Sequence, residues 1–389
     1  MFRLLFALFV SALAFSASAA RAQETPADGA VRKGAEIPIP FRFIAGRIVI
    51  PVTVNGVSAF MMVDTAAPTS LDKAFASEHG IEAVGAPQTI INPFDVSGSL
   101  RRSQGVAMDF SGGRGAFTWP EDANGPFLDD LKHLSPSAGV PISGILGSDV
   151  LKYMVLQFDF RASVLTLHVG EGVSYPETPA IPLQWFTKES WRVAMLTSEG
   201  ADDAFIVDTG APHTLNMALP NERRAAFLET HKSLPTSTSR WGEVFEDLLN
   251  ARLDWLELGG VRLENAPVTI LPPELEDMQL IGTELLSRYE VWLDGPGARL
   301  WLLPNEGTAA PFQRPLVGIS VAAETGMIVT VDPGGPADRA GVKAGVELVA
   351  ILDEDGREIL DRSALKVGEA VTLVLGDGTR RTLTVEEQY

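Results

Sequence analysis

The chain has 389 residues, a formal net charge of −19, five histidines and no cysteine. This acidic balance argues against binding to nucleic acid or to anionic membrane surfaces, since both attract basic patches. Without cysteine the chain can form neither disulfides nor thiolate metal sites, and its histidines show no ligand spacing. The sequence therefore implies no metal and no organic cofactor.

Residues 1–22 are predicted to be a cleaved export signal. Arg3 supplies a positive charge, residues 4–15 are apolar, and Ala20-Arg21-Ala22 forms a small-x-small cleavage site. The apolar run is short for a membrane-spanning helix, which needs ~20 residues, so we expect no stable membrane anchor. An uncleaved anchor is the alternative. An exported chain without cysteine fits a bacterial periplasm or secreted fluid.

A flexible leader, residues 23–39, is expected before the folded part. Residues 47–54 then alternate in polarity and are rich in β-branched side chains, which predicts a strand. Asn55-Gly56 predicts a tight hairpin turn. The returning strand carries Asp64, the first residue of interest.

An apolar run that ends in Asp-Thr occurs twice, in residues 59–68 and 204–212. In each copy the run precedes Asp, Thr, small residues and Pro, which predicts a buried strand that leads into a tight turn. A carboxylate at the end of a buried strand is costly without partners. We therefore expect Asp64 and Asp208 to be neighbours.

The repetition continues downstream, where an apolar segment followed by Gly recurs at Gly147 and Gly282. From these glycines onward the two copies align without a gap. The period of about 140 residues is too long for a solenoid repeat. It predicts two similar β-rich lobes, residues 40–178 and 179–305, related by an approximate two-fold axis.

The two copies resemble the active-site turns of the aspartic proteases. The matching residues are Asp64-Thr65-Ala66 with Gly147, and Asp208-Thr209-Gly210 with Gly282. The resemblance implies a mainly β fold of two duplicated aspartic-protease-type β-barrel lobes with a pseudo-two-fold, arranged in one chain as in pepsin. Details of the turns look more like the retroviral proteases. A duplicated β-barrel whose Asp residues only cap turns is the alternative.

The resemblance implies that Asp64 and Asp208 are a catalytic pair that hydrolyses polypeptides. Two carboxyl groups ~3 Å apart cannot both ionise, so they share one proton. The ionised group acts as a base toward water, and the protonated group donates to the scissile carbonyl oxygen. Ala67 and Ala211 stand where pepsin-like enzymes often place a hydroxyl donor, so we expect a pH optimum less acidic than that of gastric-type enzymes.

Thr65 and Thr209 would hold the two turns in register through hydroxyl-to-backbone hydrogen bonds, as the resemblance implies. The support of the pair also includes Ala66, Gly210, Gly147 and Gly282. Ala66 departs from the family, which has Gly there, and a positive φ at this position would be strained.

The first lobe lacks the Tyr that the flap of pepsin-like enzymes carries. Residues 112–119, with Gly113 and Trp119, are the flap candidate, and a packing role for Trp119 is the alternative. The alternatives to a protease are a catalytically impaired peptide-binding protein of the same fold and a structural envelope protein.

Residues 306–314 are predicted to be a linker, because they are rich in Pro, Gly and Ala. Residues 315–389 resemble a bacterial PDZ domain. Such domains add a peptide strand to a sheet edge and capture its terminal carboxylate with backbone N–H groups. Residues Leu316, Val317, Gly318 and Ile319 would form that carboxylate loop, with C-terminal peptides as partners. A purely structural or dimer-forming module is the alternative.

Overall fold

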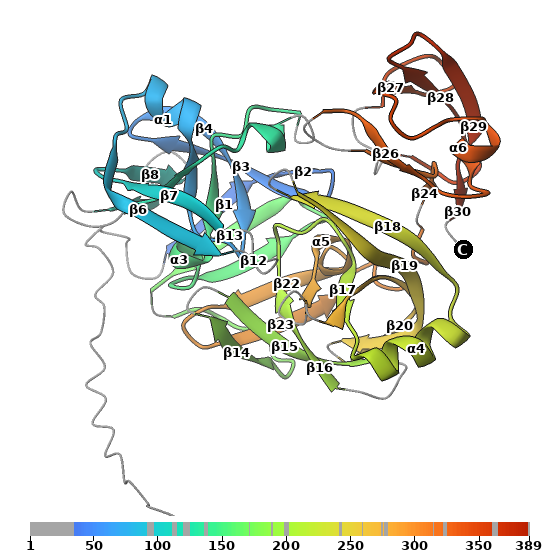
Figure 1. Cartoon of the computed structure of the whole chain (residues 1–389). Coiled ribbons are helices and arrows are strands. Elements are labelled where there is room, and N and C mark those ends of the chain that lie inside the picture. The colour runs from blue at the N-terminus through green and yellow to red at the C-terminus, as the bar shows by residue number, and fades with distance from the viewer. Residues whose placement is uncertain are drawn as a thin grey trace, which may run out of the picture.

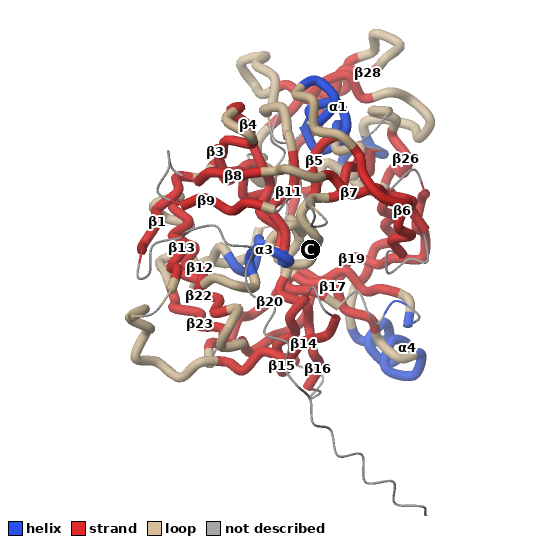
Figure 2. The backbone as a smooth tube through the Cα atoms, turned by 90° about the vertical axis from the view of Figure 1, so that its left-hand side faces the viewer, coloured by secondary structure: helices blue, strands red, loops and turns tan. Residues whose placement is uncertain are grey.

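The computed structural model describes most of the chain after residue 34. The described residues are 35–91, 97–110, 115–119, 125–135, 139–170, 172–187, 190–197, 202–240, 243–258, 260–273, 275, 279–313, 315–321, 325–359 and 365–387. The predicted export signal lies outside them. In the described part the fold is mainly β, with short helices between the strands of curled sheets (Figures 1 and 2). No helix there is long and apolar enough to cross a membrane.

The first half of the chain forms a ten-stranded sheet. Its main path runs in the order β6-β7-β10-β5-β11-β4-β3-β8-β9, with β2 paired to β3. The strands are β2 (Arg42–Ile44), β3 (Arg47–Val54), β4 (Val57–Asp64), β5 (Ser70–Asp72), β6 (Ala83–Ile91), β7 (Ser97–Ser103), β8 (Ala107–Phe110), β9 (Gly115–Thr118), β10 (Phe127–Asp129) and β11 (Gly144–Gly147). The predicted Asn55-Gly56 hairpin is confirmed, because β3 and β4 pair antiparallel around this turn.

A thirteen-stranded sheet contains the second half of the chain and joins it to the first. Its order is β1-β13-β12-β22-β23-β14-β15-β16-β21-β17-β20-β19-β18. The strands are β1 (Ala35–Pro40), β12 (Val155–Asp159), β13 (Val164–Val169), β14 (Ile181–Thr187), β15 (Ser190–Thr197), β16 (Asp202–Val207), β17 (Leu215–Ala218), β18 (Ser233–Arg240), β19 (Glu243–Leu258), β20 (Val261–Leu271), β21 (Leu280–Ile281), β22 (Tyr289–Asp294) and β23 (Arg299–Pro304).

One strand order occurs in both sheets. The order β6-β7-β10-β5-β11-β4-β3 of the first sheet corresponds to β18-β19-β20-β17-β21-β16-β15 of the second. The directions also correspond, since β4 and β11 are parallel, as are β16 and β21, and β5 and β10 are parallel, as are β17 and β20. The remaining neighbours in both series are antiparallel. The topology therefore repeats along the chain.

Short helices occupy matching places in the two halves. They are α1 (Lys73–Glu78) after β5 and α4 (Asn221–Thr230) after β17, and α3 (Ser148–Leu151) after β11 and α5 (Thr283–Leu286) after β21. A short 3-10 helix, η1 (Lys132–Leu134), lies in the first half. The two halves meet where β12 pairs with β22, and one large hydrophobic core extends through both.

The prediction of a flexible leader over residues 23–39 is wrong for its last residues, since Ala35–Pro40 forms β1 and pairs with β13. Ile37 and Ile39 are buried, with 1% exposure each, while Pro38 and Pro40 are exposed. Proline lacks a ladder N–H and is tolerated on edge strands. The proline content of this segment is therefore typical of a flexible leader, whereas its alternating isoleucines pack into the core.

The C-terminal unit has a core of its own, formed by residues between Val317 and Val385. Its described residues form three small sheets and one helix, drawn in orange to red in Figure 1. Its elements are β24 (Pro315–Leu316), β25 (Ile319–Val321), β26 (Ile328–Val331), α6 (Pro336–Arg339), β27 (Leu348–Leu352), β28 (Ala370–Leu375), β29 (Arg380–Thr384) and β30 (Glu386–Glu387). Strand β25 lies close to β18 of the second half.

The predicted linker is not a free tether. The Arg288 guanidinium donates to the carbonyls of Gly307 and Pro311 at 3.2 and 3.3 Å, and it lies 3.5 Å from the centre of the Phe312 ring. Phe312 belongs to the main core, with 5% exposure. Arg252 on β19 donates to the Phe312 carbonyl and forms an ion pair with Glu387 on β30. These contacts hold the C-terminal unit against the second half.

Candidate functional site

The two Asp-Thr turns lie against each other, joined by four reciprocal hydrogen bonds. The Thr65 hydroxyl donates to the Val207 carbonyl at 2.6 Å and accepts from the Thr209 N–H at 3.0 Å. The Thr209 hydroxyl donates to the Val63 carbonyl at 3.0 Å and accepts from the Thr65 N–H at 3.1 Å. The predicted hydroxyl-to-backbone bonds are therefore present. Both threonines are almost fully buried.

Each Asp is held by the backbone of its own turn. Asp64 Oδ1 accepts from the N–H groups of Ala66 and Ala67 at 2.9 and 3.0 Å. Asp208 Oδ1 accepts in the same way from Gly210 and Ala211 at 2.8 and 3.1 Å. Hydrogen bonds of this kind favour the ionised form of a carboxyl group and fix its orientation.

The carboxylate of Asp64 reaches the second turn. A Cβ added to Gly210 would lie 2.1 Å from Asp64 Oδ2, which is far inside any real contact distance. Only glycine fits at position 210 with Asp64 in this place. Asp64 is 9% exposed and Asp208 is half-buried, so the two carboxyl groups sit at the same junction with different access to solvent.

Ala66 fits its turn without strain. It is not among the non-glycine residues with positive φ in the described part of the chain. Its N–H still donates to Asp64, and its methyl group packs with the buried cluster of Ile206, Ala211 and Leu280. The departure from glycine at this position therefore keeps the hydrogen bonding of the turn.

Gly147 and Gly282 pack against the backbone of the two turns. A Cβ on Gly147 would lie 2.3 Å from the Ala67 carbonyl oxygen, and one on Gly282 would lie 2.1 Å from the His213 carbonyl oxygen. The next residue in each copy, Ser148 or Thr283, donates its backbone N–H to the carbonyl of the turn at 2.8 Å. Backbone thus packs directly on backbone, which explains why both copies need glycine here.

The tip of the β2–β3 hairpin also touches the second turn. Ala45 and Gly46 have φ of 48° and 71°, as a two-residue hairpin turn of the primed type requires. A Cβ on Gly46 would lie 2.6 Å from the Pro212 Cβ, and the Gly46 carbonyl accepts a hydrogen bond from the Thr283 hydroxyl.

Arg47 follows this tip directly and is not among the site residues predicted from the sequence. The register of the β3–β4 hairpin could have pointed to it. The two-residue Asn55-Gly56 turn fixes the register of its hairpin, and counting outward from it reaches Arg47 opposite Asp64.

Two other predicted positions lie away from the turns. Trp119 is 7% exposed and packs edge-on against Phe117 at 4.6 Å, in the main core. This burial supports the packing alternative and makes a cover role wrong, because a core side chain cannot close over a substrate. Gly113 lies outside the described residues. The hairpins β6–β7 and β18–β19 occupy corresponding positions in the strand orders of the two sheets.

The predicted carboxylate loop joins β24 to β25 in the C-terminal unit. Leu316 ends β24 and Ile319 begins β25, while the Val317 side chain lies in the local core. Gly318 has a φ of +84°, which favours glycine. Its carbonyl accepts from the Asp332 N–H at 3.0 Å.

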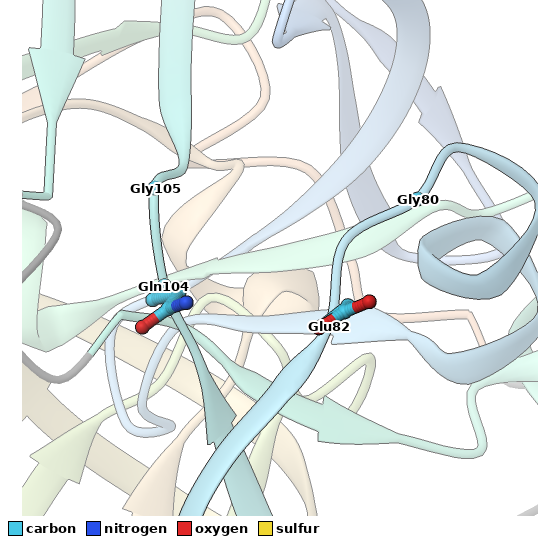
Figure 3. Close-up of a pocket in the computed structure, with 4 residues that line it drawn as sticks. All are labelled: Gly80, Glu82, Gln104 and Gly105. Atoms are coloured by element: carbon cyan, nitrogen blue, oxygen red, sulfur yellow. The ribbon is translucent and has the colours of Figure 1, made fainter.

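A shallow polar cavity of about 410 Å³ lies elsewhere, lined by Gly80, Glu82, Gln104 and Gly105 (Figure 3). These residues flank the paired ends of β6 and β7, where Ala83 lies opposite Ser103. Neither Asp of the two turns contributes to it. Among the described residues, no group of three or more His, Asp or Glu side chains is arranged to hold a metal ion.

Comparison with models of known protein families and with curated proteins finds no match to this chain. The interpretation of the site therefore depends on its geometry. The site offers two carboxyl groups on turns that are bonded to each other, each fixed by two backbone N–H groups, and carboxyl groups are common general acids and bases.

The reciprocal threonine bonds lead to a stability prediction. Thr65→Val leaves the Val207 carbonyl and the Thr209 N–H buried without this hydroxyl, so we expect a loss of about 2–4 kcal/mol in the free energy of unfolding. Thr65→Ser keeps the hydroxyl and is expected to lose much less. Urea unfolding of the purified variants measures both values.

A matched control is Thr214→Val. The Thr214 hydroxyl is fully buried and has no hydrogen-bond partner among the described residues. The same substitution there is expected to be neutral or stabilising. Equal destabilisation by Thr65→Val and Thr214→Val would show that the bonds between the turns contribute little.

Proposed function

We propose that this chain is an exported aspartic endopeptidase, built of two duplicated aspartic-protease-type lobes and a C-terminal PDZ-like unit. The observation that carries the proposal is the reciprocal bonding of Thr65 and Thr209, which brings the turns of Asp64 and Asp208 together. The repeated strand order of the two sheets supports a bilobal arrangement.

In the proposed reaction a water molecule lies between the two carboxyl groups. The ionised carboxylate takes a proton from the water molecule while the water oxygen attacks the amide carbon. The protonated carboxyl group donates its proton to the carbonyl oxygen. In the second step one hydroxyl group of the gem-diol gives its proton to the carboxylate that acted as the acid, and the C–N bond breaks as the leaving nitrogen takes the proton held by the other carboxyl group. Both carboxyl groups thereby return to their starting states. No acyl-enzyme forms in this scheme, so no Ser or Cys nucleophile is needed.

The substrates of this proposal are polypeptides outside the cytoplasm. The PDZ-like unit would bind their C-termini along β25, whose start lies at the Gly318 loop. Strand addition there would place a bound chain close to β18 of the second lobe, since β18 and β25 lie near each other.

The second candidate is a peptide-binding protein of the same fold without hydrolytic activity. The methyl group of Ala66 in place of glycine favours it. The retained N–H bond from Ala66 to Asp64 and the ordinary φ at this position favour the enzyme instead.

The test is incubation of the purified mature chain with a peptide library, with and without a statine-type transition-state analogue. We expect cleavage that the analogue blocks and that incorporates one oxygen from labelled water into each new carboxyl group, detected by mass spectrometry. Cleavage that the analogue does not affect would contradict the proposal. Binding of peptides without any cleavage would favour the second candidate.

A further inference from the structure

Arg47 lies at the register position opposite Asp64. In the β3–β4 ladder Val49 pairs with Met62, and the same register reaches Arg47 and Asp64 two residues further out. Residues directly opposite each other in an antiparallel pair project from the same face of the sheet. By this register Arg47 and Asp64 belong to the same face of the hairpin, at the end where the β3–β4 ladder stops.

The electrostatics agree with this placement. Burial lowers the pKa of Arg47, and the negative charge of Asp64 raises it in return. Arginine remains protonated over the range in which carboxyl groups titrate. A fixed positive charge therefore acts on Asp64 from within the same strand pair.

The second copy has no such cation at the matching position. In the β15–β16 ladder Arg192 pairs with Ile206, so the register position opposite Asp208 belongs to Ser190. A neutral residue type thus stands where the first copy has Arg47. The two halves repeat in topology but differ in residue type at the register position opposite each Asp, which is Arg47 in the first copy and Ser190 in the second.

Other charged groups around the turns do not reproduce this asymmetry. Asp149 of α3 binds the N–H and hydroxyl of Thr69 in the first copy, at 2.7 and 2.5 Å. In the second copy the matching acidic residue is Glu284 of α5, whose N–H bonds to the His213 carbonyl. Both copies therefore have an acidic residue type at the second position of this helix, so this pair of residues does not distinguish Asp64 from Asp208.

We propose that Arg47 is a positioning residue that keeps Asp64 in the ionised form within the carboxyl pair. Asp64 would then be the base that deprotonates water, and Asp208 would carry the shared proton. This inference rests on the proposed function and adds to it the division of roles between the two carboxyl groups. The assignment follows because a neighbouring cation favours the charged form of a carboxyl group.

The test is the pH dependence of kcat/KM for the full mature chain and its Arg47 variants. Removal of the cation raises the lower apparent pKa of the pair, so the acidic limb is expected to move upward by about 1 pH unit or more in Arg47→Met and Arg47→Gln. Arg47→Lys keeps the charge and is expected to stay within about 0.3 unit of the unchanged chain. A purely structural role would lower activity at every pH without moving the limb.

A second readout does not need activity. Carbon-13 labelling of the Asp carboxyl groups, with Asp64→Asn to identify the signal, follows the titration of Asp64 by NMR. We expect Asp64 to ionise at lower pH in the unchanged chain than in Arg47→Gln. An unchanged titration in a variant with a normal unfolding midpoint would overturn the inference. If the unchanged chain cleaves no peptide, the proposed function fails, whereas this titration still decides the role of Arg47.

Discussion

Replacement of Asp64 or Asp208 by Asn is expected to lower kcat/KM for peptide cleavage by at least about 10³-fold. An amide can neither take a proton from water nor share one with the facing carboxyl group. In the proposed mechanism both residues act as one unit, so the double variant is expected to lose little more than either single variant. Initial rates on a quenched fluorescent peptide chosen from the library measure the effect.

The fold should survive these substitutions. Asn keeps an acceptor oxygen for the two N–H groups that now bind Asp64 Oδ1 or Asp208 Oδ1. We therefore expect unfolding midpoints close to that of the unchanged chain. The control is Asp130→Asn, an exposed carboxylate in the first half, for which full activity is expected. Cleavage that persists in Asp208→Asn would contradict the enzyme proposal.

Gly210→Ala is expected to be the most damaging small substitution outside the carboxyl pair. The new Cβ would lie 2.1 Å from Asp64 Oδ2, and Asp64 cannot turn away without losing the bonds of its Oδ1. The carboxylate must shift by about 1 Å, which costs roughly 10²-fold in rate when reacting groups are misplaced. Steady-state kinetics should show the loss mainly in kcat.

The matched control is the reverse change in the other turn. Ala66→Gly introduces the glycine that the second copy has at Gly210 and removes only a methyl group that packs on Ile206 and Leu280. We expect kcat to change by less than about threefold and stability to fall by about 0.5–1 kcal/mol from added backbone freedom. Equal activity in Gly210→Ala and Ala66→Gly would mean that Asp64 does not need its present position.

Two effects on the pH profile oppose each other. The absence of a hydroxyl donor at Ala67 and Ala211 predicts a less acidic pH optimum, because the carboxylate anion then has one hydrogen-bond donor fewer to stabilise it. In the proposed role of Arg47, its charge would favour the anion of Asp64 and would extend activity toward acidic pH. The profiles of the Arg47 variants separate these two effects, since those variants lack only the second.

The sequence by itself determined the local elements of the site. An apolar run that ends in Asp-Thr can bury its strand only if a turn follows, and the Asn55-Gly56 turn set the β3–β4 hairpin. The recurrence of Gly147 and Gly282 indicated a repeat, because the two copies align without a gap from these glycines onward. The strand, the turns and the repeat are readable from the sequence without a structure.

Only the tertiary structure decided which segments are buried and which charges face each other. The prolines of residues 35–40 resembled a leader until β13 covered their isoleucines, and the segment after Pro304 resembled a linker until Arg288 and Phe312 held it in place. Trp119 lies in the core for the same reason. The four bonds between Thr65 and Thr209 join residues far apart in the chain, and their geometry depends on how two whole sheets pack, which no local pattern contains.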